Sequence, residues 1–369
     1  MIKILFFIET LKAGGAEKVM IDLVNHMDQT KFDITVQTVW PCDAKKYLAS
    51  GIRYKSMYAA ENKANHLRYR AEAESGLAYR LHIKDDYDIE CAYLEMGPTK
   101  VMSASTNQKA KKLAWVHCDL SKKVGDINAF VAKAEKQYRI FDEIICVSEN
   151  VRESFAQLFG VDTATRVLYN VVDDASIREK ALAALPDGLQ KRQMTLASLG
   201  RLTHQKGFDI LLQVHERLIR EGFVYDLWIA GEGEDRPKLE RYISERGLED
   251  SVKLLGFREN PYPILEAADL LVCSSRYEGL STFVTEGLIL GKPVVTTDCT
   301  GMRELLGDSE FGLITDMNED ALYDGIRRLL QDEDLRNNYA KKAELRGRDF
   351  STAMLVKNTE DYFMKLAGK

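Results

Sequence analysis

The chain has 369 residues, a length that predicts about two domains, each able to bury its own core without disulfides. Apolar residues make up 45 % and charged residues 29 %, with only 7 prolines, which excludes a disordered or collagen-like chain. Residues 1–150 hold 22 Lys and Arg against 20 Asp and Glu, whereas residues 151–369 hold 29 against 37. The net charge of −6 argues against a general nucleic-acid-binding protein.

Cysteine and histidine spacing gives no sign of a metal or redox site. The six cysteines lie at least 26 residues apart, and the six histidines form no HxH or HExxH pair. We interpret the thiols as reduced, in a cytoplasmic protein. The apolar start, residues 1–8, is interpreted as a strand and not a signal peptide, because Glu9 ends it and no cleavage site follows. No apolar run approaches the ~20 residues that span a bilayer, so membrane contact is expected to be peripheral, at the inner face.

The first half of the chain alternates short apolar runs with helical patterns, which is typical of βαβ units. A helix is expected over 16–27, directly after Gly14 and Gly15, and residues 58–84 are helical in composition with weak patterning. The polar stretch 174–191 is interpreted as the linker and the entry to a second domain. Strands are expected over 3–8, 33–39, 89–93, 112–116 and 143–147.

The second half repeats this alternation. Strands are expected over 194–199, 225–230, 252–255, 270–273 and 293–297, and helices over 208–221, 236–246, 263–268 and 281–290. The fold class is therefore α/β, with two Rossmann-like domains facing a central cleft, because open parallel sheets bind ligands at the carboxyl ends of their strands.

Two glutamates eight residues apart, Glu278 and Glu286, span the junction from a strand into a helix that begins near Ser281. The free backbone N–H groups of residues 280–283 and the helix dipole would attract an anion there. The pair therefore predicts a phosphate site with one carboxylate on each side. The alternative is that Glu278 caps the helix and Glu286 is a solvated surface charge.

Two cations five residues apart, Arg201 and Lys206, lie in the loop Gly200–Gly207 after the first strand of the second half. Such a pair suits a diphosphate, since it neutralises a leaving phosphate without a metal. The spacing does not match the phosphate-binding loop GxxxxGK[ST]. The alternative is two ordinary loop charges.

Three further segments carry weaker signals. Gly14 and Gly15 would let backbone approach a ligand, although tight packing of the turn explains them nearly as well. His117 ends a strand and is expected to face the cleft, with a core or surface histidine as the alternative. Residues 231–235 contain GxG, but their acidic side chains would repel a pyrophosphate, so this segment is not a dinucleotide fingerprint.

In this order, the segments resemble the family-four retaining glycosyltransferases of the GT-B fold, of the bacterial polysaccharide or glycoconjugate type. The resemblance covers nearly the whole chain, and the combination of E-x7-E, R-x4-K and GxGxE is specific. It implies an acceptor-binding domain over 1–173 and a nucleotide-sugar-binding domain over 190–350. The last helix, about 351–369, would pack back on the first domain. The segments that carry the resemblance are GGAEK, WVH, GRLTHQKG, LWIAGEGED, LLGF, the run from NPYP to KPVV, and GMRELLGD.

The resemblance also implies roles for single residues. Arg201 and Lys206 would hold the donor diphosphate, Glu286 the ribose and Glu278 the sugar hydroxyls. His117 would contact the sugar. The catalytic residues would therefore be Glu278, His117, Arg201 and Lys206. The loop 256–258 would bind the nucleobase. The donor-binding residues would be Gly14, Gly15, Arg201, Lys206, Phe257, Arg258, Glu278, Gly279, Leu280, Ser281, Thr282, Phe283 and Glu286.

The implied reaction transfers a sugar from a nucleoside-diphosphate sugar, UDP-sugar favoured, to a glycan or lipid-linked acceptor. It would retain configuration, with the leaving phosphate accepting the proton, and would use no cofactor, no metal and no nucleic acid. A GT-B nucleotide-sugar epimerase or phosphorylase and a non-catalytic two-lobed sugar-nucleotide-binding protein are the alternatives. A lysine cluster near His117 suggests contact with an anionic lipid phosphate, with a solvated rim as the alternative; its members are Lys109, Lys111, Lys112, Lys122 and Lys123.

Overall fold

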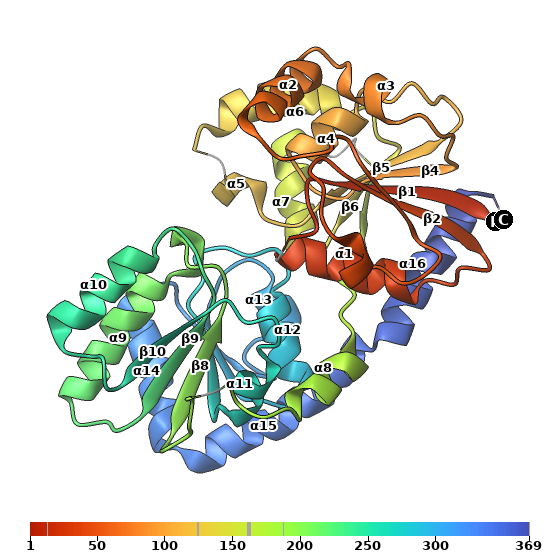
Figure 1. Ribbon diagram of the computed structural model, residues 1–369. Coiled ribbons are helices and arrows are strands. Elements are labelled where there is room, and N and C mark those ends of the chain that lie inside the picture. The colour runs from red at the N-terminus through yellow and green to blue at the C-terminus, as the bar shows by residue number, and fades with distance from the viewer. Residues whose placement is uncertain (13, 124, 161–163, 187, 369) are drawn as a thin grey trace. The chain divides into compact units, whose positions relative to one another are not determined.

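The computed structural model describes residues 1–12, 14–123, 125–160, 164–186 and 188–368 and divides into two compact units. Unit 1 comprises Met1–Val172 and Thr352–Lys369, and unit 2 comprises Asp173–Ser351. Each unit is built on one parallel sheet covered by helices (Figure 1). The predicted α/β class, with two Rossmann-like sheets, is confirmed.

The sheet of unit 1 has seven strands in the order β3-β2-β1-β4-β5-β6-β7, and every pairing is parallel. The five interior strands were expected from their apolar runs. The two edge strands were not, because each is short and partly exposed, with the sequences RYKS and TRV. The strands are β1 Ile2–Ile8, β2 Phe32–Thr38, β3 Arg53–Ser56, β4 Ile89–Ala92, β5 Lys111–Val116, β6 Glu143–Cys146 and β7 Thr165–Val167.

The last helix of the chain, α16 (Thr352–Leu366), belongs to unit 1 and packs beside α1 (Gly15–His26; Figure 1). Its Phe363 is fully buried, with ring centroids 6.1 Å from Phe6 and 6.3 Å from Phe32. The other helices of unit 1 are η1 Ala44–Lys46, α2 Lys63–Glu74, α3 Ala78–His82, α4 Gly97–Met102, α5 Leu120–Lys123, α6 Ile127–Tyr138 and α7 Glu149–Phe159.

The sheet of unit 2 has six parallel strands in the order β10-β9-β8-β11-β12-β13. The order reverses between β8 and β11, as it does between β1 and β4 in unit 1. Ligands of open parallel sheets bind beyond the carboxyl ends of the strands at such a reversal. The strands are β8 Thr195–Leu199, β9 Asp226–Ala230, β10 Val252–Gly256, β11 Leu270–Cys273, β12 Val294–Thr297 and β13 Leu313–Thr315.

The polar stretch 174–191, expected to be the linker and the entry to a second domain, lies within unit 2 and begins with helix α8 (Asp174–Ala181). The Asp173 side chain caps this helix by accepting a bond from the Ser176 N–H, and Ile177 and Ala181 are buried as it packs on α11 and α12. The other helices of unit 2 are η2 His204–Lys206, α9 Phe208–Arg220, α10 Arg236–Arg246, α11 Tyr262–Ala267, α12 Thr282–Ile289, α13 Met302–Leu306, α14 Glu319–Gln331, α15 Glu333–Gly347 and η3 Arg348–Phe350.

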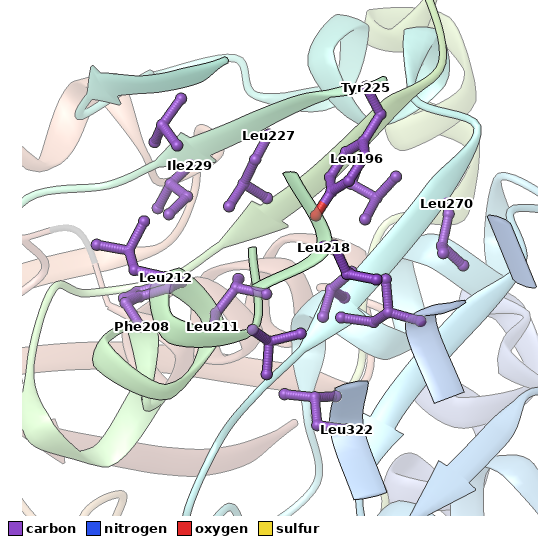
Figure 2. Close-up of a cluster of buried hydrophobic side chains, with 14 of the residues drawn as sticks. Leu196, Phe208, Leu211, Leu212, Leu218, Tyr225, Leu227, Ile229, Leu270 and Leu322 are labelled. Carbon is purple, nitrogen blue, oxygen red and sulfur yellow. The ribbon is translucent and has the colours of Figure 1, made fainter. Parts of the chain in front are cut away.

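A buried apolar cluster fixes α9 against the sheet of unit 2. Figure 2 shows leucines of α9, such as Leu211 and Leu218, beside side chains of β8, β9 and β11 and near Leu322 of α14. Each fully buried leucine contributes about 1.5–3 kcal/mol relative to an exposed one. The cluster therefore fixes the start of α9, and with it the end of the loop that follows β8.

Among the described residues, none of the helices combines the length and the apolarity that crossing a membrane requires.

His215 of α9 is also fully buried, with Nδ1 2.9 Å from the Tyr225 hydroxyl and Nε2 2.9 Å from Ser251 Oγ. Burial lowers the pKa of His215 to about 4. An unfolded histidine titrates near 6.5, so the unfolded chain binds more protons than the folded one between these two values. Stability should therefore fall as the pH drops through this window.

We expect the loss attributable to His215 to reach about 3 kcal/mol between pH 6.5 and pH 4, from the difference between the two pKa values. Urea unfolding of the wild type and of His215→Asn at pH 7, 5.5 and 4, followed by fluorescence, measures it. The variant should be less stable at pH 7 but should lose less stability on acidification. Other titrating groups are common to both proteins, so an equal pH dependence would show that His215 is not responsible.

Candidate active site

The loops that follow β8 and β11 meet at the reversal point of the unit 2 sheet. There the Lys206 ammonium lies 2.6 Å from Oε1 of Glu278, and Ser275 Oγ donates a bond of 2.7 Å to the same oxygen. Glu278 is only 6 % exposed. Two residues 72 positions apart in sequence thus form one charged pair at the edge where the strands end.

The ion pair with Glu278 keeps the Lys206 ammonium protonated. Burial disfavours the ammonium, but the adjacent Glu278 carboxylate outweighs that effect and holds the pKa of Lys206 above its ordinary value. Lys206 is therefore cationic at neutral pH. A cation kept charged beside an accessible loop can bind an anionic group without a metal.

The backbones of the two loops touch. Gly207 has φ +64°, and a Cβ there would lie 2.1 Å from the carbonyl oxygen of Ser274. The Ser274 hydroxyl donates to the Lys206 carbonyl at 2.9 Å. Only glycine combines this conformation with this approach, so Gly207 sets the position of Lys206.

Glycines of neighbouring loops allow the same close packing. A Cβ on Gly231 would lie 1.9 Å from the Gly200 carbonyl oxygen, and one on Gly301 would lie 2.2 Å from the Gly279 carbonyl oxygen. Gly231 begins the GxG segment after β9. This glycine therefore supports the loop that carries Arg201 and Lys206 through backbone contact.

An ion pair that the sequence analysis did not predict connects the loops that follow β8 and β11. The Arg276 guanidinium makes two bonds of 2.9 Å to the carboxylate of Asp209 and one of 2.7 Å to the His204 carbonyl. Asp209 lies at the start of α9. No spacing rule joins residues 67 positions apart, so only the three-dimensional fold shows this link.

The second predicted glutamate is buried in helix α12. Glu286 is 3 % exposed and accepts a bond of 3.2 Å from the Tyr262 hydroxyl, so the alternative of a solvated surface charge is wrong. Ser281 caps α12 through its side chain. The segment Gly279–Phe283 thus forms the entry to this helix, as expected, and its N-terminus lies between the two glutamates along the chain.

The remaining predicted residues of unit 2 differ in exposure. Arg201 is exposed, and its guanidinium has no protein partner in the part of the chain that the structure describes. Phe257 is 58 % exposed, directly after Gly256 at φ +73°. Nε of Arg258 is buried without a hydrogen-bond partner among the described residues. The structure therefore brings Lys206 and Glu278 together but leaves Arg201 and Phe257 facing solvent.

In unit 1, His117 follows β5 and its ring is half-buried, 5.0 Å from the ring of Tyr93. Nε2 is buried and has no hydrogen-bond partner among the described residues. Burial lowers the pKa of His117 to about 4, against the opposing charge of Glu95. His117 is therefore a neutral imidazole at pH 7.

The predicted glycine pair begins α1, with Gly14 as its N-cap. Gly14 has φ −161°, which is extended backbone open to any residue. A Cβ there would lie 2.2 Å from the Glu17 carboxylate, at the flexible end of a side chain. The conformation of Gly14 therefore does not require glycine.

Glu95 is a buried carboxylate that the sequence analysis missed. It is 2 % exposed, accepts the backbone N–H of His117 at 3.1 Å and pairs with the Lys123 ammonium at 2.7 Å. Burial opposes its charge, but Lys123 and His117 together hold the pKa of Glu95 at about 2. The next residue, Met96, has φ +68°, which is uncommon outside glycine. A charged residue shortly after a strand was the only sequence signal.

Replacing Glu95 by glutamine should lower stability by about 1–3 kcal/mol, because the neutral amide leaves the Lys123 ammonium and the His117 N–H without their charged acceptor. The turn that carries His117 should shift, and catalytic turnover should fall by roughly tenfold. Urea unfolding and steady-state kinetics measure the two effects. Glu135→Gln, at an exposed carboxylate, is the matched control. A variant as stable and active as this control would contradict the proposed role of Glu95.

Several lysines of the predicted basic cluster are engaged within unit 1. Lys111 pairs with Asp142 at 3.3 Å, Lys112 donates to the Asn107 carbonyl at 2.9 Å, and Lys123 holds Glu95. Membrane association of this surface stays a prediction. In the described part of the chain, no group of three or more His, Cys, Asp or Glu is placed to hold a metal ion.

Two family models match the chain. Residues 13–176 match Glycosyltransferase Family 4, and residues 186–346 match Glycosyl transferases group 1. A *Campylobacter jejuni* relative, N-acetylgalactosamine-N,N'-diacetylbacillosaminyl-diphospho-undecaprenol 4-alpha-N-acetylgalactosaminyltransferase, is 32 % identical over 226 residues, 60 % of either chain. The amylovoran biosynthesis glycosyltransferase AmsD of *Erwinia amylovora* is 22 % identical over 370 residues, 98 % of this chain and 99 % of that one.

Solved structures share the fold. The crystal structure of *Anabaena* Alr3699/HepE in complex with UDP and glucose has a TM-score of 0.78 at 19 % identity and covers 99 % of this chain and 100 % of that one. Sucrose-phosphate synthase from *Thermosynechococcus elongatus* has a TM-score of 0.81 at 17 % identity, with 99 % of both chains covered. This similarity shows that the chain has the GT-B fold. The two family matches, which together span residues 13–176 and 186–346, show that the chain belongs to the family-four glycosyltransferases.

Proposed function

We propose that the protein transfers a sugar from a nucleoside-diphosphate sugar to a hydroxyl of a glycan, lipid-linked or other glycoconjugate acceptor. The observation that carries this proposal is the Lys206–Glu278 pair at the reversal point of the unit 2 sheet, in the loop that also carries the exposed Arg201. The *Campylobacter* relative is named as a transferase acting on a lipid-diphosphate-linked sugar, which supports this acceptor class.

The site chemistry fits a diphosphate leaving group. Negative charge that develops on the leaving phosphate would be stabilised by the Lys206 ammonium, the Arg201 guanidinium and the N-terminus of α12. The buried Glu286 carboxylate suits the hydroxyls of a ribose, and Glu278 those of the transferred sugar. Uridine diphosphate is the favoured donor nucleotide, in keeping with the UDP bound in the *Anabaena* structure.

The proposed reaction retains the configuration of the sugar. The acceptor hydroxyl attacks the anomeric carbon as the bond to the diphosphate breaks, and its proton passes to the departing phosphate oxygen. His117 would contact the sugar as a neutral imidazole, because burial keeps its pKa at about 4. Proton NMR of the first product formed distinguishes retention from inversion at the anomeric carbon.

Donor screening followed by turnover tests the function. UDP-glucose, UDP-galactose, UDP-N-acetylglucosamine and GDP-mannose are compared by thermal shift, where a donor at 100 times its Kd adds about 2.7 kcal/mol of stability. The donor that binds is then incubated with and without undecaprenyl-diphosphate-linked oligosaccharides. We expect release of the nucleoside diphosphate only with acceptor. An epimerase would convert the donor without acceptor, and a binding protein would release nothing.

We expect the reaction to proceed without a metal ion, because Lys206 and Arg201 supply the charge that a divalent cation would otherwise bring to the diphosphate. Turnover in the presence of excess EDTA should equal that without it. Adding Mg²⁺ after EDTA is the control for effects of the chelator itself. Loss of turnover with EDTA and its recovery with Mg²⁺ would overturn metal independence while leaving the transferase assignment intact.

A further inference from the structure

A cavity of about 460 Å³ opens in unit 1 beside helix α2. Glu9 follows β1 and Gly97 follows β4, so the cavity lies at the carboxyl ends of the two strands between which the order of this sheet reverses. Open parallel sheets bind ligands at this place. The residues that line the cavity and matter here are Glu9, His66, Tyr69, Arg70, Gly97 and Lys100.

Two polar groups of the cavity have no hydrogen-bond partner among the described residues. The hydroxyl of Tyr69 is buried and has no hydrogen-bond partner among the described residues. A Cβ on Gly97 would lie only 2.8 Å from this hydroxyl, so the hydroxyl of Tyr69 packs directly against Gly97. The Arg70 guanidinium is exposed and likewise has no protein partner in the described ranges. A buried hydroxyl is destabilising unless a ligand or water completes its hydrogen bonds.

The carboxylates that line the cavity are matched in number by the arginine and lysine side chains that line it. Glu9 and Glu74 oppose Arg70 and Lys100, and Glu74 pairs with both Lys100 and Lys133. Hydrogen bonds from these two lysines lower the pKa of Glu74, so it stays ionised. A phosphate would meet two carboxylates here. A neutral molecule with many hydroxyls instead matches a lining that offers both acceptors and donors.

Aromatic rings complete the lining. The His66 ring lies 4.2 Å from the ring of Trp40, and the Tyr69 ring lies 5.7 Å from it, edge to face. Trp40 itself is buried, so it holds the other two rings in place. Rigid rings of this kind offer a flat apolar surface beside polar groups, which suits the C–H face of a sugar ring.

We propose that this cavity binds a neutral sugar of the acceptor glycan, with Tyr69 and Arg70 hydrogen-bonded to its hydroxyls. The proposal rests on the transferase function proposed above and takes unit 1 as the acceptor-binding unit, the role that the family resemblance implies for residues 1–173. Tyr69 and Arg70 would then determine the affinity for acceptor, and they would leave donor binding in unit 2 unchanged.

Saturation-transfer NMR with four probes tests the proposal: the methyl glycosides of glucose, galactose, N-acetylglucosamine and N-acetylgalactosamine. At least one should bind the wild type, and Tyr69→Phe and Arg70→Ala should each weaken it by roughly tenfold, the loss of about one good hydrogen bond. Tyr47→Phe and Arg80→Ala, at exposed residues outside the cavity lining, are the matched controls and should bind as the wild type does. Circular dichroism verifies that all four variants are folded.

Three outcomes would overturn the proposal: no glycoside binds the wild type, the cavity variants bind as the controls do, or inorganic phosphate displaces the glycoside in competition. The thermal shift given by the UDP-sugar is measured on the same samples and should be equal in all of them. A wild type that binds glycoside but never releases nucleoside diphosphate would refute the transferase function and leave the sugar site standing. The two failures are thus distinguishable.

Discussion

Replacing Lys206 by alanine is expected to lower kcat/KM for sugar transfer by about 10²- to 10³-fold, the usual loss on removing one preorganised group that stabilises charge in the transition state. The ammonium is held 2.6 Å from Glu278 and kept charged by it, so alanine removes a fixed positive charge from the site. Steady-state kinetics with the identified donor measure the loss. Arg201→Ala should also reduce kcat/KM.

Measurements of stability distinguish the structural role of Lys206, its ion pair with Glu278, from its role in the reaction. Its removal leaves Glu278, only 6 % exposed, as an unpaired charge, which should cost about 3 kcal/mol. The double variant Lys206→Ala with Glu278→Gln removes that charge and should recover much of the stability but none of the activity. Lys253→Ala, at an exposed lysine of β10, is the control. Unchanged turnover in Lys206→Ala would exclude this residue from the reaction.

The second large effect is expected from Gly207→Ala. The new Cβ would lie 2.1 Å from the Ser274 carbonyl oxygen, a backbone atom that cannot rotate away, and the residue would also keep φ near +64°. We expect a loss of more than about 2 kcal/mol in the free energy of unfolding. Transfer should also fall steeply, because the loop that carries Lys206 must move.

Gly222→Ala is a matched control for this experiment. Gly222 has φ +91°, and a Cβ there meets nothing within 4 Å, so the substitution tests the backbone conformation alone. It should cost about 1 kcal/mol and leave transfer unchanged. Urea unfolding and kinetics of both variants measure the difference. Equal losses for the two glycines would show that the contact with Ser274 contributes nothing.

Strand prediction succeeded in the interior of each sheet and failed at three edges. Interior strands such as β1 and β8 are buried on both faces and therefore appear as continuous apolar runs. Edge strands β3, β7 and β13 have only three or four residues and are partly exposed, so they lack that signal. Helix α8 was missed for a related reason, because only Ile177 and Ala181 of its eight residues are buried.

The candidate site was predictable as a location and not as a set of contacts. The carboxyl ends of parallel strands share one edge, so the sequence could place Arg201, Lys206 and Glu278 near each other. It could not show that Lys206 and Glu278 touch, nor that Arg276 binds Asp209, because those distances depend on how two loops fold against one another. Glu95 escaped notice because one glutamate after a strand has no distinctive spacing.

The return of α16 to unit 1 has a consequence for biosynthesis. Because α16 follows all of unit 2 along the chain, the ribosome makes it after unit 2, and Phe363 reaches Phe6 and Phe32 only then. The apolar patch that it covers stays open to water, and to chaperones, while unit 2 is still being translated. The hydrogen bond of 2.8 Å from Thr352 Oγ1 to the Val172 carbonyl marks the point where the nascent chain rejoins the unit that it left. Unit 1 thus begins to fold before unit 2 and is completed after it.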